Sequence, residues 1–374
     1  MDLTTKYLGL TLRSPLVASA GPLTGTADGI ARLAAAGVGA VVLPSLFEEQ
    51  LRAEAERDSR LAEAYADSHA EAAGYLPGYQ PGPEPGQVPR RYLDLIERAA
   101  AQTRIPVIAS LNGVSPGGWT DYASAIQQAG ASAIELNIYY LPGDPLLPSR
   151  DAERRYTEIL TTVKAVVSIP VAVKLSPYFS SFGEMAVVLD HAGADGLVLF
   201  NRFLQTDIDP ETFTVSSGFR LSTPAEAALP RAWISRLRGL VRCSLAASTG
   251  VDTYADVAAY LLAGADVVMS TSSLLRHGPD HARVLLDGLR AWLDRKGFGS
   301  VAQVRGLLAK LAEGEPAYGR TGYLSAIDQA SHAYAARRLS RTPRLCKMPY
   351  ARRLSLAGDL NYRRAGRRGG FCRV

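Results

Sequence analysis

The stretch from Val241 to Gly278, VRCSLAASTGVDTYADVAAYLLAGADVVMSTSSLLRHG, decides how the rest of the chain is interpreted. It contains an apolar strand over 242–247, then a helix, and then a second strand over 266–270. Both strands run into turns built of Gly, Ser or Thr, which are Ser248-Thr249-Gly250 and Thr271-Ser272-Ser273. Backbone N–H groups at such turns, together with a helix N-terminus, favour a bound phosphate. The stretch therefore predicts a phosphate site.

Two recurring patterns mark the remaining strands. An Ala-Gly pair ends an Ala/Leu-rich helical stretch and precedes an apolar run four times, where the Gly suits a left-handed helix C-terminus and a buried parallel strand follows. These segments are 36–42, 129–135, 192–198 and 263–268. Between them, Pro15, Pro106 and Pro170 each stand at the first position of a strand, where no ladder hydrogen bond is lost.

The two patterns alternate along the chain and give eight buried strands. The predicted strands are 15–20, 39–46, 105–111, 132–138, 170–175, 195–200, 242–247 and 266–270. A doubly wound open sheet produces similar local patterns, but eight evenly alternating units favour a closed (β/α)₈ TIM barrel. The phosphate site of such barrels lies after strands seven and eight, which is where the opening stretch falls.

Long segments follow the second, fourth and sixth strands, at 47–89, 139–150 and 201–229. We expect them to be long loops at one end of the barrel, because structureless connections of this length are usually lids or binding loops. Beyond the eighth strand, helices are predicted over 279–296, 300–312 and 318–341.

Length and charge divide the chain into three parts. A barrel is expected over 1–312, a helical extension over 313–340 and a disordered basic tail over 341–374. The tail has ten Lys or Arg residues and one acidic residue, so its net charge is +9. The whole chain has a net charge of +5, and residues 1–340 therefore carry −4. The body therefore has no general basic surface for nucleic acid.

Cysteine usage and hydropathy point to a cytoplasmic protein. No run approaches the ~20 apolar residues of a membrane span, and residues 1–13 lack a signal peptide's apolar core. Cys243, Cys346 and Cys372 form no metal-binding spacing, and Cys243 fits a small core residue. No metal and no membrane span are expected.

Polar side chains gather at the carboxyl ends of the predicted strands. They include three Asn, one Lys and several hydroxyls, but no His, and Glu135 is the only acid. The residues at this end are Ser19, Ala20, Gly21, Pro44, Ser45, Ser110, Asn112, Gly113, Glu135, Asn137, Tyr139, Tyr140, Lys174, Ser176, Asn201 and Arg202. This set disfavours a hydrolase triad or a metal cage. It suits a planar, amide-rich ligand with a phosphate, such as an isoalloxazine ring with its ribityl phosphate.

Lys174 ends an apolar strand and supports more than one function. It could form a Schiff base, as lysines of barrel aldolases do. It could also place a positive charge beside the N1/C2 carbonyl of a flavin and favour the anionic reduced form. A third reading is a lysine that is merely paired at the barrel rim.

The chain resembles the class 1 dihydroorotate dehydrogenases, which are FMN-containing (β/α)₈ enzymes, along roughly residues 2–312. The matching segments are SPLVASAGP, IELN ending at Asn137, VAVKLSPYFSSF around Lys174, ADGLVLFN ending at Asn201 and STGVDTYADVAAYLLAGADVVMSTSSLLRHGP. The resemblance implies that FMN is bound by Ser19, Ala20, Gly21, Ser45, Asn137, Lys174, Thr249, Gly250, Ser270 and Thr271. It also implies that Asn137 and Asn201 bind substrate. A homodimer is expected.

Two departures from the family concern the substrate side. Members read Asn-Leu-Ser-Cys-Pro-Asn after strand four, and that Cys is the base, whereas Tyr140 stands at its position here. An unperturbed Tyr has a pKa near ~10 against ~8.5 for Cys, so Tyr140 is a weaker base at neutral pH. The family's Lys-Ser pair on strand two reads Pro44-Ser45, and Pro offers neither charge nor N–H.

These features predict an FMN-dependent oxidoreductase that oxidises the CH–CH bond of dihydroorotate or a related dihydropyrimidine, with hydride transfer to flavin N5. Tyr140 is the candidate base, and pyrimidine biosynthesis is the expected context. The alternatives are a Schiff-base lyase that uses Lys174, and a non-catalytic flavin- or phosphate-binding barrel. No iron–sulfur or nicotinamide motif is visible in the sequence, so fumarate, oxygen, quinone and a partner flavoprotein all remain open as electron acceptors.

Overall fold

The computed structural model describes residues 1–49, 90–112, 116–140, 143–218, 220–309 and 320–339. The chain divides into two compact units, Met1–Pro316 and Ala317–Val374. The first unit contains every strand and all but one of the described helices, so the site is built within it.

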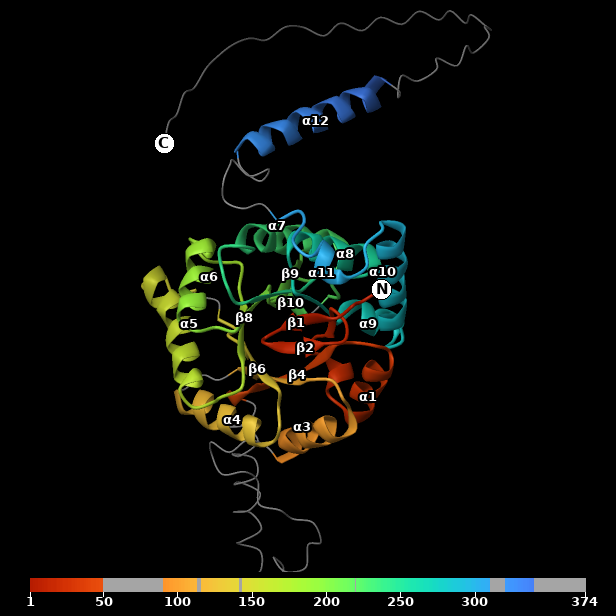
Figure 1. Cartoon of the computed structure of the whole chain (residues 1–374). Coiled ribbons are helices and arrows are strands. Elements are labelled where there is room, and N and C mark those ends of the chain that lie inside the picture. Colours follow the sequence, from red (N-terminus) through yellow and green to blue (C-terminus); the bar gives the residue numbers. More distant parts are fainter. Residues whose placement is uncertain (50–89, 113–115, 141–142, 219, 310–319, 340–374) are drawn as a thin grey trace, which may run out of the picture. The chain divides into compact units, whose positions relative to one another are not determined.

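Eight parallel strands form a closed barrel in the first unit (Figure 1). In chain order they are β3 (Leu16–Ala18), β4 (Ala40–Phe47), β5 (Val107–Asn112), β6 (Ala133–Asn137), β7 (Val171–Leu175), β8 (Gly196–Leu199), β11 (Ser244–Ala247) and β12 (Val267–Ser270). The last strand pairs with the first, with Val268 opposite Leu16, and this pairing closes the ring. The predicted TIM barrel is confirmed, and β11 and β12 are its seventh and eighth strands.

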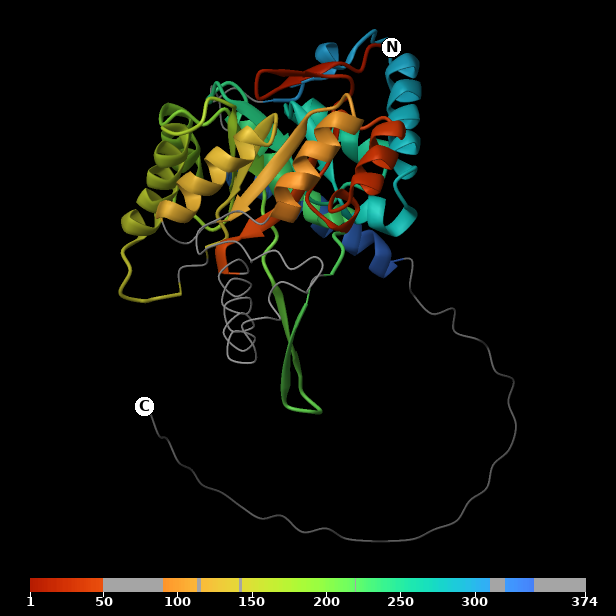
Figure 2. The ribbon, with the colours of Figure 1, turned by 90° about the horizontal axis from the view of Figure 1, so that it is seen from below.

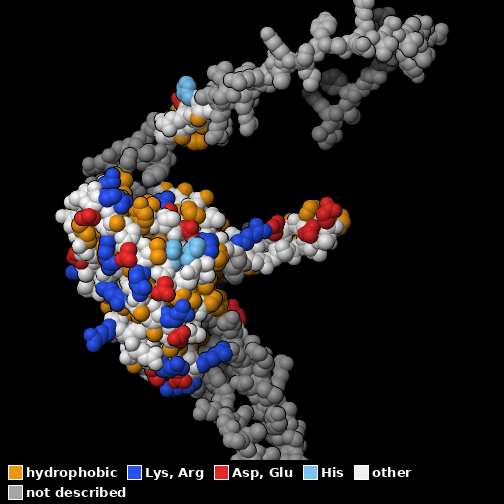
Figure 3. Space-filling model, turned by 90° about the vertical axis from the view of Figure 1, so that its right-hand side faces the viewer, with side chains coloured by type: hydrophobic (Ala, Val, Ile, Leu, Met, Phe, Trp, Pro, Cys, Tyr) orange, Lys and Arg blue, Asp and Glu red, His pale blue; other side chains and the backbone are white. Residues whose placement is uncertain are grey.

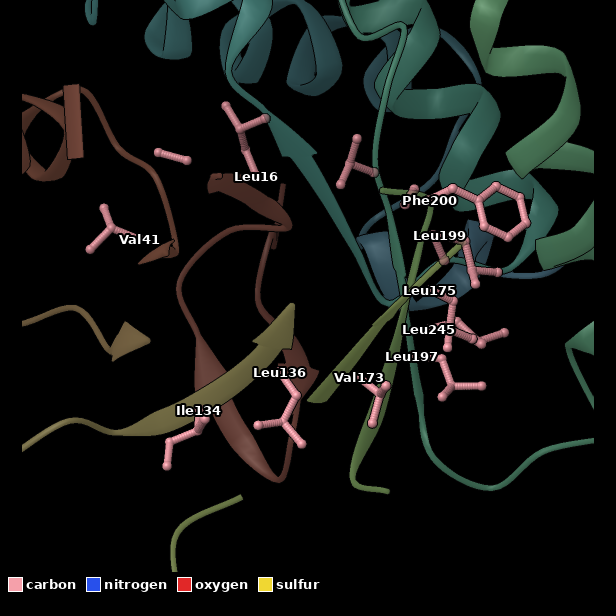
Figure 4. Packing of buried hydrophobic residues seen from close by; sticks show 14 of the residues in the cluster. Leu16, Val41, Ile134, Leu136, Val173, Leu175, Leu197, Leu199, Phe200 and Leu245 are labelled. Carbon is pink, nitrogen blue, oxygen red and sulfur yellow. The ribbon is translucent and has the colours of Figure 1, made fainter. Parts of the chain in front are cut away.

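Helices surround the barrel and cover its outer face (Figure 1). They are α1 (Ala27–Ala35), α3 (Arg90–Gln102), α4 (Pro116–Gln128), α5 (Ser149–Lys164), α6 (Phe182–His191), α7 (Ala228–Leu237), α8 (Tyr254–Ala263) and α10 (His281–Arg295). Successive residues of a strand point to opposite faces. Leu136, Val173 and Leu197 accordingly pack in the layer between barrel and helices (Figure 4), whereas Val198 and Ala172 fill the barrel interior.

A short antiparallel hairpin closes the amino end of the barrel. It consists of β1 (Thr5–Tyr7) and β2 (Leu10–Leu12), and Tyr7, Leu8 and Leu12 belong to the interior cluster. The Leu8 N–H donates to Ser244 Oγ at the start of β11. Burial raises the pKa of Tyr7 well above its usual value, and the carboxylates of Glu135 and Asp266 raise it further. These side chains therefore fill the amino end of the barrel interior.

A second hairpin follows β8 and was expected as a loop. Its strands are β9 (Gln205–Asp209) and β10 (Thr214–Gly218), which pair only with each other. Figure 2 shows it projecting from the barrel at the end opposite the β1–β2 hairpin. The short helix η3 (Pro224–Ala227) then leads into α7.

The other expected loops are described in part. Residues 50–89 of the segment after the second strand, and 141–142 after the fourth, lie outside the described residues.

The chain after the barrel differs from expectation in one helix. The predicted helix over 300–312 is correct only at its start, because α11 spans Val301–Val304 and residues 305–309 are not helical, while 310–312 lie outside the described residues. Gly306 has a φ of 77° and donates its N–H to Leu261 O, so the backbone leaves the helical path to contact α8. The prediction over 279–296 is confirmed by α10, and that over 318–341 by α12 (Arg320–Leu339) in the second unit. The predicted basic tail lies outside the described residues.

Candidate active site

A cavity of about 570 Å³ opens at the carboxyl ends of the barrel strands. It brings together nine of the residues predicted from the sequence, contributed by five different strands and the turns after them. These are Ser19, Ala20, Gly21, Lys174, Asn201, Thr249, Gly250, Ser270 and Thr271. Its volume lies within the ~300–1,000 Å³ that cofactor and ligand sites occupy.

The wall that follows β3 is made of small residues packed directly on the turn after β12. A Cβ added to Gly21 would lie 2.6 Å from Thr271 Cγ2, so no side chain fits there without displacement of Thr271. The Thr271 hydroxyl donates to Ala20 O at 3.3 Å, and the Ser19 N–H donates to Ser270 O at 3.1 Å. The two loops therefore form one surface, and backbone lies open to a ligand.

The turn after β11 has an unusual backbone. Thr249 and Gly250 have φ of 81° and 72°, a conformation that non-glycine residues such as Thr249 rarely adopt. The Tyr260 hydroxyl donates to Thr249 O at 2.7 Å and to Ser248 O at 3.2 Å, which holds the turn from below. A Cβ on Gly250 would meet Ala227 at 2.8 Å. Only glycine fits this position.

A serine that the sequence analysis did not single out joins the two turns. Ser222 accepts the Gly250 N–H at 3.2 Å on its Oγ, and its hydroxyl donates to Ser272 Oγ at 3.0 Å. Arg276 donates to the carbonyl oxygen of Ser222 at 2.8 Å. Ser222 lies far from any barrel strand in sequence and is returned to the cavity by the β9–β10 segment, so strand-end reasoning could not find it. The predicted phosphate position is thus lined by N–H and hydroxyl groups from three segments.

Lys174 forms a buried ion pair inside the barrel. Its Nζ lies 3.3 Å from Glu135 Oε1, with 8% of Lys174 and 1% of Glu135 exposed. Glu135 Oε2 has no hydrogen-bond partner in the part of the chain that the structure describes. Burying two charges is costly, and mutual attraction offsets that cost only when the geometry holds them together. The pair fixes a cation at the floor of the cavity.

The two asparagines are locked into one chain of hydrogen bonds. Asn201 Nδ2 donates to Asn137 Oδ1 at 2.5 Å, and Asn137 Nδ2 donates to Ser45 Oγ at 2.9 Å. The hydroxyls of Ser45 and Ser110 lie 2.8 Å apart. Because Asn201 lines the cavity while Asn137 and Ser45 are behind it, the chain fixes the orientation of the Asn201 amide.

Tyr92 of α3 supports the same wall from outside the barrel. Its hydroxyl lies 3.1 Å from the carbonyl oxygens of Pro44 and Ser110 and from the N–H of Ser110. Burial raises the pKa of Tyr92 far above its usual value, so it stays a neutral donor. Ser45 also lines a neighbouring cavity of about 550 Å³ with Pro44 and Tyr92.

Two arginines complete the rim of the main cavity. Arg202 pairs with Glu226 at 3.0 Å, and Arg220 pairs with Asp207 at 2.5 Å. Arg202 also donates to the carbonyl oxygen of Arg220, which joins the two ends of the β9–β10 hairpin at its base. Arg202 follows β8 and was noted at the strand ends, whereas nothing in the sequence marked Arg220.

Tyr140 lies apart from the other predicted site residues. It lines a second cavity of about 230 Å³ together with Tyr156, Ser176 and Tyr178. The guanidinium of Arg155 lies 4.7 Å from the centre of its ring. The structure therefore does not bring Tyr140 into the cavity that Lys174 lines, and its role as a base stays a prediction.

Within the described ranges, no group of three or more His, Cys, Asp or Glu side chains could bind a metal ion. In the same part of the chain, none of the helices has the length and apolar character needed to cross a membrane.

The fold and the cavity define the class of protein, namely a (β/α)₈ barrel with a polar, lysine-bearing site at the carboxyl ends of its strands. Residues 2–293 match the model of the family described as "Dihydroorotate dehydrogenase", and the chain belongs to that family. This membership places the protein among oxidoreductases and confirms the resemblance found in the sequence.

Curated relatives carry related names. The chain is 30% identical to "Putative dihydroorotate dehydrogenase A (fumarate)" of Aeropyrum pernix over 57% of this chain and 70% of that protein. It is 30% identical to "Dihydroorotate dehydrogenase B (NAD(+)), catalytic subunit" of Methanocella arvoryzae, over 79% of this chain and 94% of that protein. The identically named protein of Methanothermobacter thermautotrophicus is 27% identical, over 82% and 98%.

Proposed function

We propose that the protein is an FMN-dependent oxidoreductase that oxidises the CH–CH bond of dihydroorotate or a related dihydropyrimidine. The observation that supports this most is a single cavity lined by Lys174, by Asn201 and by the turns that contain Gly21 and Gly250. Membership of the dihydroorotate dehydrogenase family supports the reaction class.

The residues present fit FMN. The contact between Gly21 and Thr271 leaves backbone rather than side chain facing the cavity, which suits a flat ring. The Gly250 N–H and the hydroxyls of Ser222 and Ser272 are linked by hydrogen bonds in the part of the cavity where we place the phosphate. FMN, when bound, supplies an isoalloxazine ring that accepts hydride at N5.

Lys174 has a charge-stabilising role in this proposal. Glu135 lies beside its ammonium and stabilises the positive charge, whereas a Schiff-base lysine reacts as the neutral amine. The pair therefore favours a fixed cation next to the flavin ring over the alternative of a lyase. A cation at this place would stabilise negative charge on a bound flavin.

Asn201 would orient the substrate ring, and Asn137, from behind the cavity wall, would act by holding the Asn201 amide. The Asn201 Nδ2 donates to Asn137, which leaves the Asn201 Oδ1 and the remaining N–H for a ligand. Amide groups match the alternating donors and acceptors of a dihydropyrimidine edge. Tyr140 is proposed as the base that removes the ring proton. This role rests on its sequence position alone, since its side chain lines the cavity of about 230 Å³ and not the one that Lys174 lines.

A homodimer is part of the proposal.

The names of the relatives differ in the electron acceptor, fumarate in one case and NAD⁺ in others, and no acceptor is proposed for this chain.

Titration of flavin-free protein with FMN tests the cofactor directly. We expect saturable binding, detected by the quenching of FMN fluorescence. The Gly250→Val variant should bind FMN more weakly, because the added side chain would meet Ala227. Riboflavin, which lacks the phosphate, should bind more weakly than FMN to the wild-type protein. Equal affinity for FMN and riboflavin would contradict the assigned phosphate position.

A further inference from the structure

Arg276 joins three segments of the chain behind the predicted phosphate position. It belongs to the short helix α9 (Ser272–His277), which follows the turn after β12. Its Nη2 donates to the carbonyl oxygen of Ser222 at 2.8 Å, and its Nη1 lies 2.5 Å from Asp252 Oδ1. Arg276 itself does not line the cavity of about 570 Å³, so any effect on a ligand there would pass through these two partners.

Ser222 is the partner that reaches the cavity. Its N–H donates to Ser272 Oγ at 2.9 Å, and its own Oγ accepts the Gly250 N–H at 3.2 Å. It lies on the connection between β10 and η3, so no barrel strand positions it. The bond from Arg276 holds its carbonyl oxygen, and because the donor is charged this bond is stronger than one between neutral groups. Arg276 therefore keeps the Ser222 hydroxyl against the turn after β11.

Asp252 is the partner that matters for charge. It lies two residues after Gly250, and its carboxylate would repel a phosphate held by that turn. Arg276 is always protonated and lies 2.5 Å from this carboxylate, whereas His277 Nε2 lies 3.8 Å away. The side chains of Arg276 and Asp252 are only 33% and 29% exposed, so solvent screens the pair incompletely. Arg276 therefore neutralises a negative charge beside the phosphate position.

The surroundings hold Asp252 in place independently of Arg276. His281 Nε2, on α10, lies 3.0 Å from the Asp252 carbonyl oxygen, and the rings of His277 and His281 lie 4.6 Å apart. Figure 3 shows histidine side chains next to basic and acidic ones on the body of the molecule. Because α10 holds this backbone, removal of the Arg276 guanidinium would leave the carboxylate near the turn.

We infer that Arg276 is the positioning residue of the FMN phosphate site and acts through the Ser222 backbone and the Asp252 carboxylate. The inference rests on the proposed FMN site and adds a selective consequence to it. Both effects act where we place the phosphate, whereas we place the ring beside Lys174. Binding of a phosphorylated flavin should therefore depend on Arg276, and binding of a flavin without the phosphate should not.

Titration of the flavin-free full chain with FMN and with riboflavin tests the inference. Arg276→Met keeps a long apolar side chain and removes the guanidinium. We expect it to raise the Kd for FMN by about tenfold or more, because a charged hydrogen bond and an ion pair are lost together. The Kd for riboflavin should change by less than about twofold. Arg290→Met on α10 is the matched control, since neither Arg290 nor its partner Asp287, 2.7 Å away, lines the cavity.

The double variant Arg276→Met, Asp252→Asn separates the two effects. It removes the carboxylate that Arg276 neutralises, so it should bind FMN more tightly than Arg276→Met does. A double variant that binds FMN no more tightly overturns the part of the inference that concerns Asp252. Arg276→Lys keeps the charge but has one nitrogen in place of the two that contact Ser222 and Asp252. Its affinity for FMN should lie between those of the wild type and Arg276→Met.

The outcomes distinguish this inference from the proposed function. A wild type that binds FMN no more tightly than riboflavin overturns the proposed phosphate position, and the inference with it. A wild type that prefers FMN, together with an Arg276→Met variant that keeps the same preference, overturns the inference alone. An equal loss of affinity for both flavins, with the fold followed by circular dichroism, indicates a general structural role and also overturns it. Should Arg276→Met fail to fold, the FMN preference of Arg276→Lys decides in its place.

Discussion

The buried pair of Lys174 and Glu135 yields a prediction whose magnitude follows from the structure. Lys174→Met keeps the length of the side chain and removes its charge, which leaves the Glu135 carboxylate inside the barrel without a counter-ion. One of its oxygens, Oε2, already lacks a partner among the described residues. Removal of one member of a buried pair typically lowers the free energy of unfolding by about 3 kcal/mol or more.

The assay is thermal or urea unfolding of flavin-free protein, so that cofactor binding does not contribute to the measured stability. A loss of this size lowers the Tm by roughly 6 °C in a domain of this scale. The double variant Lys174→Met, Glu135→Leu should recover most of the loss, because no unpaired charge is then buried.

Arg290→Met is the matched control for this prediction. Arg290 pairs with Asp287 at 2.7 Å, but both side chains are about half exposed, and such surface pairs contribute only about 0–1 kcal/mol. A Lys174→Met variant no less stable than Arg290→Met would refute the reasoning. A double variant as unstable as Lys174→Met would refute it equally.

Four further predictions concern single residues. If Tyr140 is the base, Tyr140→Phe should lower turnover by about 10²–10⁴-fold, the range typical of the loss of a general base. Unchanged steady-state turnover would remove Tyr140 from the mechanism. Gly250→Ala should weaken FMN binding, as measured by titration, because of its φ of 72° and the contact with Ala227; an unchanged affinity contradicts the assigned turn geometry. Burial raises the pKa of the Cys243 thiol, so Cys243 should resist alkylation at pH 8 in the folded protein and react after denaturation, as mass spectrometry would report. Burial raises the pKa of Asp190, but its hydrogen bonds from the N–H groups of Cys243 and Arg242 outweigh burial and hold the pKa below its usual value. Its contribution to stability is therefore present above the unfolded-state pKa of about 4 and lost as pH falls through the lower folded-state value; Asp190→Asn should destabilise the protein at pH 7 and much less at pH 2, and a pH-independent loss contradicts this.

The barrel could be predicted because its strands carry local signals. The Ala-Gly pair before β12 ends α8 with Gly264 in the left-handed conformation, as the pattern requires. Pro at the strand starts and unbroken apolar runs mark strands that are buried on both faces. Each signal is contained within a few residues, so the sequence alone was sufficient.

The features that were missed depend on contacts between distant segments. The β1–β2 hairpin has strands of three residues, too short for a periodic pattern, and is defined by its packing inside the barrel. Ser222 enters the site only because the β9–β10 hairpin turns the chain back toward β11 and β12. The predicted helix over 300–312 ended early because Gly306 bonds to α8, a contact that no local propensity encodes.

For Tyr140, the position in the chain could be predicted from the sequence, but the placement of the side chain could not. Its position after β6 follows from the motif, and the structure describes its side chain in a cavity next to that of Lys174 rather than within it. Arg155 on α5 stacks its guanidinium over the Tyr140 ring, a contact that the sequence does not specify.

The absorbance spectrum of the purified protein, recorded during anaerobic addition of dihydroorotate and related dihydropyrimidines, tests the proposed flavin-dependent oxidation. We expect an oxidised-flavin spectrum that is bleached by at least one of these compounds and that returns on admission of an electron acceptor. A colourless protein that takes up no FMN, or a flavin that no dihydropyrimidine bleaches, would contradict it.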